Sequence, residues 1–257
     1  NYSEEQQNII DSSGNCIILG GPGVGKTHTL IGKVIHELTI NNQNVLILTR
    51  IGSVVEEIVQ RTSMELNKPL LQVGNSNHYS YTNEITGKTL GIASYDAFID
   101  YQLRINKIGF DGNDFQEKNI KFKKLCTTVP DIYIKNNKKL EVKVDILLLD
   151  EAQDLTHDDI NNLIQILKKN KYLKIILFGD ILQTLFNQST KKGYDSPIWE
   201  FYKQCNKIEV SCSILQLRTC FRCPEGHINF YNQICIENIW FDKYKLEKMK
   251  YGRKDNT

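Results

Sequence analysis

Short apolar runs alternate with amphipathic stretches along most of the chain. The apolar runs predict six β-strands, and they are nearly continuous rather than alternating, as is typical of strands buried on both faces. These strands are expected at residues 16–19, 44–49, 89–93, 144–150, 174–178 and 214–217. Helices are predicted at residues 4–10, 26–38, 53–61, 95–103, 157–169 and 224–235. The alternation predicts an α/β fold, in which helices cover both faces of a mostly parallel sheet.

Length and composition are those of a folded globular domain. The 257 residues suffice for one large α/β domain, and 40% apolar with 24% charged residues excludes wholesale disorder. No apolar run approaches the ~18 residues of a membrane-spanning helix, so no membrane partner is expected. The N-terminus lacks a secretory signal, and the seven cysteines do not form the dense, even framework of a secreted scaffold. We therefore expect an intracellular protein of the cytoplasm or nucleus, with a viral source left open.

The net charge of +2 conceals two basic segments. Residues 99–144 contain ten basic and six acidic side chains, and residues 241–257 contain six basic and three acidic ones. Such segments are compatible with a nucleic-acid partner, although solvated surfaces are the commoner explanation. Residues 104–140 are also the least periodic part of the chain, which suggests an insertion or subdomain.

A phosphate-binding loop is predicted directly after the first strand. It fits the pattern GxxxxGK[ST] and consists of Gly20, Gly21, Pro22, Gly23, Val24, Gly25, Lys26 and Thr27. Its backbone N–H groups and the following helix N-terminus can bind phosphate oxygens. Lys26 can neutralise the β and γ phosphates, and the Thr27 hydroxyl can bind Mg²⁺. The alternative is an ordinary glycine-rich turn.

Two carboxylates end the apolar strand at residues 144–150. Ligands bind at the carboxyl ends of strands in open α/β sheets. Asp150 can hold Mg²⁺, and Glu151 can orient and deprotonate the attacking water. An exposed pair that caps the next helix is the alternative. The two motifs together predict hydrolysis of ATP or GTP.

The segment DEAQD at residues 150–154 resembles motif II of the UvrD/Rep-type superfamily 1A DNA helicases. This resemblance implies a RecA-like P-loop NTPase domain that uses ATP and Mg²⁺. Residues 2–7 resemble the family's Q motif, in which Gln6 would read adenine; its amide can both donate and accept. His28 stands where the family often has an arginine that contacts the nucleotide.

Two further segments resemble motifs III and IV of this family. GDILQTLF at residues 179–186 implies that Gln183 senses the γ-phosphate and that Phe186 stacks on a DNA base; a core aromatic is the alternative for Phe186. LRTCFRCP at residues 217–224 implies that Phe221 packs on adenine and Arg222 binds the γ-phosphate. Zinc ligation by the cysteines of this second segment is a weaker alternative.

Segments like motifs Ia and Ib supply the expected DNA contacts. Residues 46–49 and the following helix resemble motif Ia, which assigns Thr49 and Arg50 to DNA, although the family's usual Phe-Thr-Asn-Lys is absent. Residues 94–98 resemble motif Ib and assign Ser94 and Tyr95 to DNA. Each segment, taken alone, also fits a core strand and a helix start.

The resemblance extends over residues 2–232 and implies the N-terminal motor domain of an ATP-dependent DNA helicase. Domain 1A is expected at residues 1–98 and 144–232, a short 1B-like insertion at 99–143, and a basic tail or the start of a second motor domain at 233–257. Single-stranded DNA and a second RecA-like domain, in the same or another chain, are the implied partners, with movement 3′ to 5′. The alternatives are a helicase-like subunit of a nuclease or recombination complex, and a nucleotide-dependent DNA-binding module without turnover.

Overall fold

The computed structural model describes residues 2–74, 77–111, 114–136, 144–170, 172–180, 182–183, 196–236 and 245–252, without the side chains of residues 115 and 127–136. Its main sheet has eight strands. In spatial order these are β3 (Leu71–Gln72), β4 (His78–Thr82), β5 (Thr89–Ser94), β2 (Val45–Thr49), β6 (Ile146–Asp150), β7 (Lys174–Gly179), β1 (Asn15–Gly20) and β8 (Cys212–Leu217). From β5 to β8 all neighbours are parallel, whereas β3 and β4 are antiparallel. The carboxyl ends of six strands therefore lie at one edge of the sheet.

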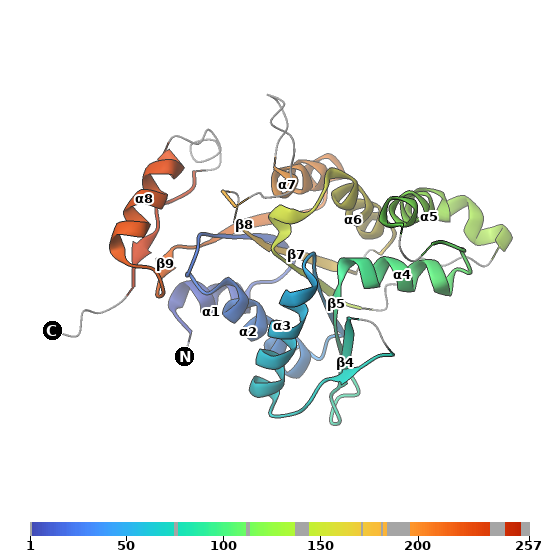
Figure 1. Cartoon of the computed structure of the whole chain (residues 1–257), viewed down its shortest axis with the longest axis horizontal. Coiled ribbons are helices and arrows are strands. Elements are labelled where there is room, and N and C mark those ends of the chain that lie inside the picture. Colours follow the sequence, from blue (N-terminus) through green and yellow to red (C-terminus); the bar gives the residue numbers. More distant parts are fainter. Residues whose placement is uncertain are drawn as a thin grey trace.

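Helices cover both faces of this sheet (Figure 1). They are α1 (Glu4–Asp11), α2 (Lys26–Thr39), α3 (Gly52–Leu66), α4 (Tyr95–Ile105), α5 (Phe115–Asn136), α6 (His157–Lys169), α7 (Pro197–Lys207) and α8 (Glu225–Ile236), with a 3₁₀ turn η1 (Ala152–Asp154). A short parallel pair joins β9 (Thr219–Cys220) to β10 (Lys250–Tyr251) beside α8. The expected α/β fold, a mostly parallel sheet between layers of helices, is confirmed.

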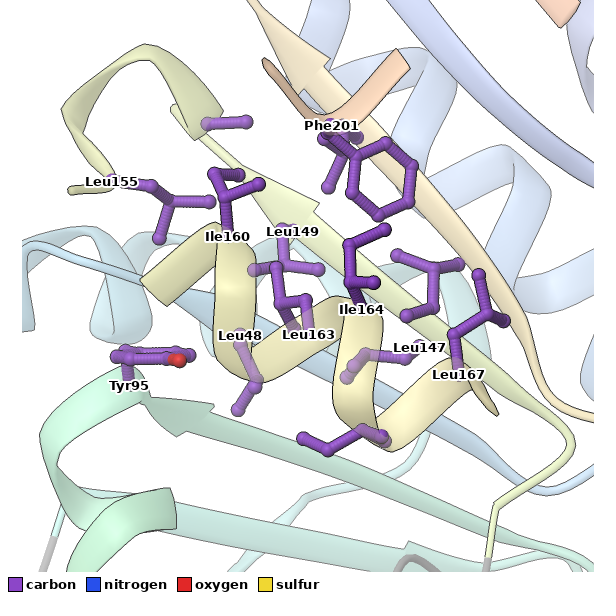
Figure 2. Packing of buried hydrophobic residues seen from close by; sticks show 14 of the residues in the cluster. Leu48, Tyr95, Leu147, Leu149, Leu155, Ile160, Leu163, Ile164, Leu167 and Phe201 are labelled. Atoms are coloured by element: carbon purple, nitrogen blue, oxygen red, sulfur yellow. The ribbon is translucent and has the colours of Figure 1, made fainter. Parts of the chain in front are cut away.

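Two hydrophobic cores lie on opposite faces of the sheet, because successive strand residues point to opposite sides. In β6, Leu147 and Leu149 belong to the core under α4, α5, α6 and α7, whereas Ile146 and Leu148 belong to the core under α1, α2 and α3. Figure 2 shows side chains of α6 packed against the first of these pairs. Burial on both faces explains why these strands are continuously apolar.

All six expected strands and all six expected helices are present, but several elements are additional. The structure adds β3, β4, the β9–β10 pair, α5 and α7. The helix α7 begins with Pro197 directly after Ser196, a sequence signal for a helix start, and its buried face carries Trp199 and Phe201. The strand β4 has the sequence HYSYT, and its residues are partly exposed. It lacks the continuous apolar run that predicts a buried strand.

The region expected to form an inserted subdomain packs directly on the main core. Phe122 and Leu125 of α5 are buried in the cluster that also contains residues of α4 and α6. Lys118 of α5 pairs with Asp100 of α4 at 3.1 Å. The boundaries at residues 99 and 143 stay a prediction, and α4 already begins at Tyr95. Among the described residues, no helix is long and apolar enough to cross a membrane.

Candidate functional site

The predicted phosphate loop connects β1 directly to α2. Gly23 and Gly25 have φ angles of 76° and 85°, a left-handed conformation that glycine adopts without a steric penalty. Lys26, the first residue of α2, donates from Nζ to the carbonyl oxygens of Gly20 at 3.0 Å and Gly21 at 3.2 Å. The ammonium group thus lies over the mouth of the loop, within reach of a bound phosphate.

The hydroxyl and the carboxylate predicted to bind Mg²⁺ are in contact. Thr27 Oγ1 donates to Asp150 Oδ2 at 3.3 Å, across 123 residues of sequence. Asp150 is only 2% exposed, and burial together with the Glu151 carboxylate raises its pKa to about 6. Attraction by Lys26 and hydrogen bonds from the Glu151 N–H and the Thr27 hydroxyl offset only part of this rise. The Asp150 oxygen atoms and the Thr27 hydroxyl match the ligand chemistry of Mg²⁺, so these residues fit the expected cation.

Glu151 is held in place by Gln153, a residue of the DEAQD segment to which the motif resemblance assigned no role. Glu151 adopts φ 50°, an uncommon left-handed conformation for a non-glycine residue and a recurring feature of active sites. Gln153 Nε2 donates to Glu151 Oε2 at 2.5 Å, and Gln153 Oε1 accepts from the Asp180 backbone N–H at 3.0 Å. Gln153 is 2% exposed and therefore connects the ends of β6 and β7 through one buried amide.

Asp180, directly after β7, is a second buried carboxylate at this site. Its Oδ1 accepts from the Tyr231 hydroxyl at 2.8 Å and from the Leu182 N–H at 3.0 Å, whereas its Oδ2 has no hydrogen-bond partner among the described residues. Burial raises the pKa of Asp180, and attraction by Lys26 acts in the opposite direction. Asp180 belongs to the segment GDILQTLF, but the resemblance to motif III assigned it no role. No sequence signal indicated that Tyr231 of α8 would contact it.

The segment around residues 220–223 folds onto the phosphate loop. The Phe221 backbone N–H donates to the Gly23 carbonyl at 3.1 Å. A Cβ at Gly23 would lie 2.9 Å from Cys220 Sγ, 3.0 Å from Arg222 Cβ and 3.1 Å from Cys223 Sγ, so only glycine fits there. The structure therefore brings Phe221 and Arg222 beside the phosphate loop, and the Phe221 ring is 42% exposed; packing on adenine by Phe221 and γ-phosphate binding by Arg222 stay predictions.

Gln6 and His28 also lie at the phosphate loop. Gln6 is buried, accepts from the Ser3 N–H at 2.9 Å and donates to the Val24 carbonyl at 3.5 Å. Its amide therefore attaches α1 to the loop, and a contact with adenine stays a prediction. His28 stacks on the Tyr2 ring with 4.7 Å between centroids, so it is part of this N-terminal packing.

Gln183 lies beside this group of residues, since its N–H donates to the Asp180 carbonyl at 3.1 Å. Its side chain is exposed. Phe186 lies outside the described residues, so its stacking on DNA stays a prediction. For zinc, the described residues contain no group of three or more potential ligands.

The residues assigned to DNA by motifs Ia and Ib lie at and after the ends of β2 and β5, where Thr49 pairs in register with Asp150, and they are largely enclosed. The Tyr95 ring has no exposed surface, and Arg50 lies 5.8 Å above it while pairing with Asp159 at 4.0 Å. Thr49 is 1% exposed, and Ser94 is 8% exposed and caps α4 by accepting from the Ala97 N–H. The Tyr95 ring therefore has no surface on which a base could stack. DNA contacts by these four residues stay predictions.

One family profile and two solved structures are similar to this chain. A family profile described as an AAA domain matches residues 4–188. The large terminase of a thermophilic bacteriophage superposes with a TM-score of 0.52 at 12% identity, over 94% of this chain and 52% of the terminase. The Pyrococcus furiosus Hef helicase domain gives a TM-score of 0.43 at 13% identity, over 82% of this chain and 37% of that chain. No curated protein sequence matches significantly. The chain spans about half the terminase's length, and at this identity the likeness shows the fold alone.

Proposed function

Because this chain belongs to the AAA domain family, whose profile matches residues 4–188, we propose that it is the N-terminal motor domain of an ATP-dependent DNA helicase or translocase. The observation that carries the proposal is the convergence of three strand ends. The ends of β1, β6 and β7 bring Lys26, Asp150 and Asp180 to one site. Two buried carboxylates beside a lysine and a hydroxyl suit a cation–polyphosphate complex far better than a structural cluster.

The chemistry follows from the positions of the side chains. Lys26 would exchange the loop carbonyls for β and γ phosphate oxygens, while Thr27 and Asp150 hold Mg²⁺. When bound by these residues, the cation would supply positive charge to the phosphate oxygens. Glu151 would orient and deprotonate the attacking water, and its hydrogen bond to Gln153 would keep its carboxylate directed at that water.

Coupling to the γ-phosphate would run through the contacts between β6 and β7. Gln153 joins Glu151 to the Asp180 backbone, and Gln183 follows three residues later. A change at the phosphate would therefore reach the segment in which Phe186 is expected to stack on single-stranded DNA. The exposed Arg222 segment would complete the nucleotide site together with a second RecA-like domain, and movement 3′ to 5′ is the polarity that the helicase resemblance implies.

ATP hydrolysis with and without single-stranded DNA tests the proposal, with Lys26→Ala as the blank. We expect turnover that DNA stimulates and that the variant loses. A duplex with a 3′ overhang then tests for strand separation, and one with a 5′ overhang tests the polarity. Binding of Mg-ATP without turnover would favour a nucleotide-dependent binding module, and failure of the wild-type chain to bind Mg-ATP would refute the proposal.

A further inference from the structure

A pair of thiols rests on the phosphate loop where the sequence reads Cys-Phe-Arg-Cys. Cys220 Sγ donates to the Pro22 carbonyl at 3.3 Å, and Cys223 Sγ reaches the same oxygen at 3.7 Å. The two sulfur atoms also lie 2.9 and 3.1 Å from the point that a Cβ at Gly23 would occupy. The Cys223 N–H donates to Cys220 Sγ at 3.4 Å, which brings the two residues together in a tight turn. Both are free cysteines in the structure.

These thiols are a structural connection between the segment that carries Arg222 and the phosphate loop. Each S–H group is a weak donor, and both are directed at one carbonyl group of the loop. Burial and the neighbouring Cys220 raise the pKa of Cys223, while Arg222 acts in the opposite direction. The Cys223 thiol therefore keeps its proton at neutral pH and remains a donor to Pro22.

We infer that Cys220 and Cys223 form a redox-sensitive dithiol, which closes to a disulfide with a low-molecular-weight disulfide as oxidant and thereby loosens the phosphate loop. A disulfide has no S–H group, so both hydrogen bonds to the Pro22 carbonyl would be lost. The new bond would also shift the two sulfur atoms that now enclose Gly23. Arg222, which lies between the two cysteines, would be redirected by the same change.

The difference in burial between the two thiols sets the order of the exchange. Cys223 is partly exposed, whereas Cys220 is fully buried, so Cys223 is the attacking thiol. The Cys223 thiol loses its proton to solvent, and its sulfur attacks the small disulfide, forms a mixed disulfide and releases one small thiolate, which takes up a proton. The Cys220 thiol then loses its proton in the same way, and its sulfur attacks the Cys223 sulfur and releases the second small thiolate. The protein loses two electrons and two protons, and the oxidant is reduced to two thiols.

Oxidised glutathione, followed by dithiothreitol, provides the test on the whole chain. Peptide mapping under non-reducing conditions should find a Cys220–Cys223 disulfide. Hydrogen exchange in the peptide over residues 20–27 should become faster on oxidation and recover on reduction. The affinity for a fluorescent ATP analogue should fall by roughly fivefold, as expected for the loss of about 1 kcal/mol of hydrogen bonding. Only this last measurement rests on the proposed function, so failure to bind nucleotide leaves the other two decisive.

Two variants separate this pair from the other cysteines. Cys223→Ser keeps an O–H donor for Pro22 but cannot form the disulfide. Its hydrogen exchange over residues 20–27 should therefore resemble that of the reduced wild type and should not change when the oxidant is added. Cys212→Ser is the matched control, because Cys212 hydrogen bonds with Cys205 and is a competing site; this variant should respond like the wild type. A disulfide confined to Cys205 and Cys212, or a Cys220–Cys223 disulfide that leaves the exchange of residues 20–27 unchanged, would overturn the inference.

Discussion

The carboxyl edge of the sheet contains two charged regions that differ in how their charges are compensated. At the ends of β1, β6 and β7, Asp150 and Asp180 are buried carboxylates with raised pKa values, and Asp180 Oδ2 has no hydrogen-bond partner in the part of the chain that the structure describes. Near the ends of β2 and β5, Asp159 is equally buried and burial raises its pKa as well, but it is paired with Arg50 and accepts from the Thr156 hydroxyl and backbone N–H.

The difference distinguishes a binding site from a structural network. In the second region Arg50 and Thr156 offset part of the cost of burying the Asp159 carboxylate, so less electrostatic energy remains for a ligand. In the first region Asp150 and Asp180 are each buried and repelled by Glu151, a cost in stability that a bound cation can relieve. The motif resemblance assigned nucleotide or Mg²⁺ binding to the first region and DNA binding to the second. Only the ion pairs and hydrogen bonds within the folded protein distinguish the two.

In the first region, Glu151→Gln should produce the largest effect, a loss of ATP turnover. The amide cannot deprotonate water, so we expect turnover of ATP to fall about 10²–10⁴-fold while Mg-ATP binding is retained. Steady-state ATPase and equilibrium binding assays measure the two separately. Glu57→Gln, at an exposed ion pair on α3, is the control and should leave both unchanged. Normal turnover in Glu151→Gln would show that Glu151 is not the general base of the first region.

Asp150→Asn should stabilise the metal-free chain. The pKa of Asp150 is raised to about 6 in the folded chain from an ordinary 3.8. Folding therefore favours the protonated carboxyl group, and the stability that this adds is fully present below about pH 4 and is lost as the pH rises through 6. Asparagine mimics the protonated form, and we expect a gain of about 2 kcal/mol in the free energy of unfolding at pH 7.5 and almost none at pH 4. Urea unfolding in EDTA measures it.

Addition of Mg²⁺ sharpens the same experiment. The cation should stabilise the wild type and have a smaller effect on Asp150→Asn, since the variant lacks the carboxylate. If Asp150→Asn instead lowered stability in EDTA at pH 7.5, the carboxylate would already be compensated within the protein. The two regions would then be alike in this respect.

Arg50→Met tests the second region. It should lower the free energy of unfolding by about 1–2 kcal/mol, because Asp159 would lose its charged partner inside the protein. Chemical denaturation measures the loss, and Arg61→Met, at an exposed pair with Glu57, is the matched control with little expected change. Unchanged stability together with weaker binding of single-stranded DNA would make Arg50 a DNA ligand instead.

Tyr231→Phe should produce the smallest effect. It removes the O–H donor to Asp180 Oδ1, and we expect a loss of about 1 kcal/mol in the free energy of unfolding. Thermal or urea unfolding is sufficient to detect it. Tyr172→Phe, at a ring that is 92% exposed, controls for loss of a phenol elsewhere. Equal stability of both variants would mean that α8 does not hold the Asp180 carboxylate.

Much of the fold could be predicted because its strongest elements have local signals. The strands of the sheet interior are continuous apolar runs, and α6 matches its predicted bounds because the capping box of Thr156 and Asp159 precedes a clear amphipathic pattern. The antiparallel strand β4 lacks such a run because it is half-exposed near the sheet edge. The helix α5 was hidden because its lysine-rich sequence obscures the spacing of Phe122 and Leu125.

By itself, the sequence determined the glycine-rich loop, the two carboxylates at the carboxyl end of β6 and the parallel α/β arrangement, because each depends on neighbouring residues or on a short period. Only the tertiary structure decided that Gln153 bridges two strand ends, that Tyr231 holds Asp180, and that Arg50 is paired inside the protein. These contacts join segments up to 109 residues apart in the case of Arg50 and Asp159. Chain spacing cannot specify them, since each requires two surfaces that meet only after the strands have paired and the helices have packed.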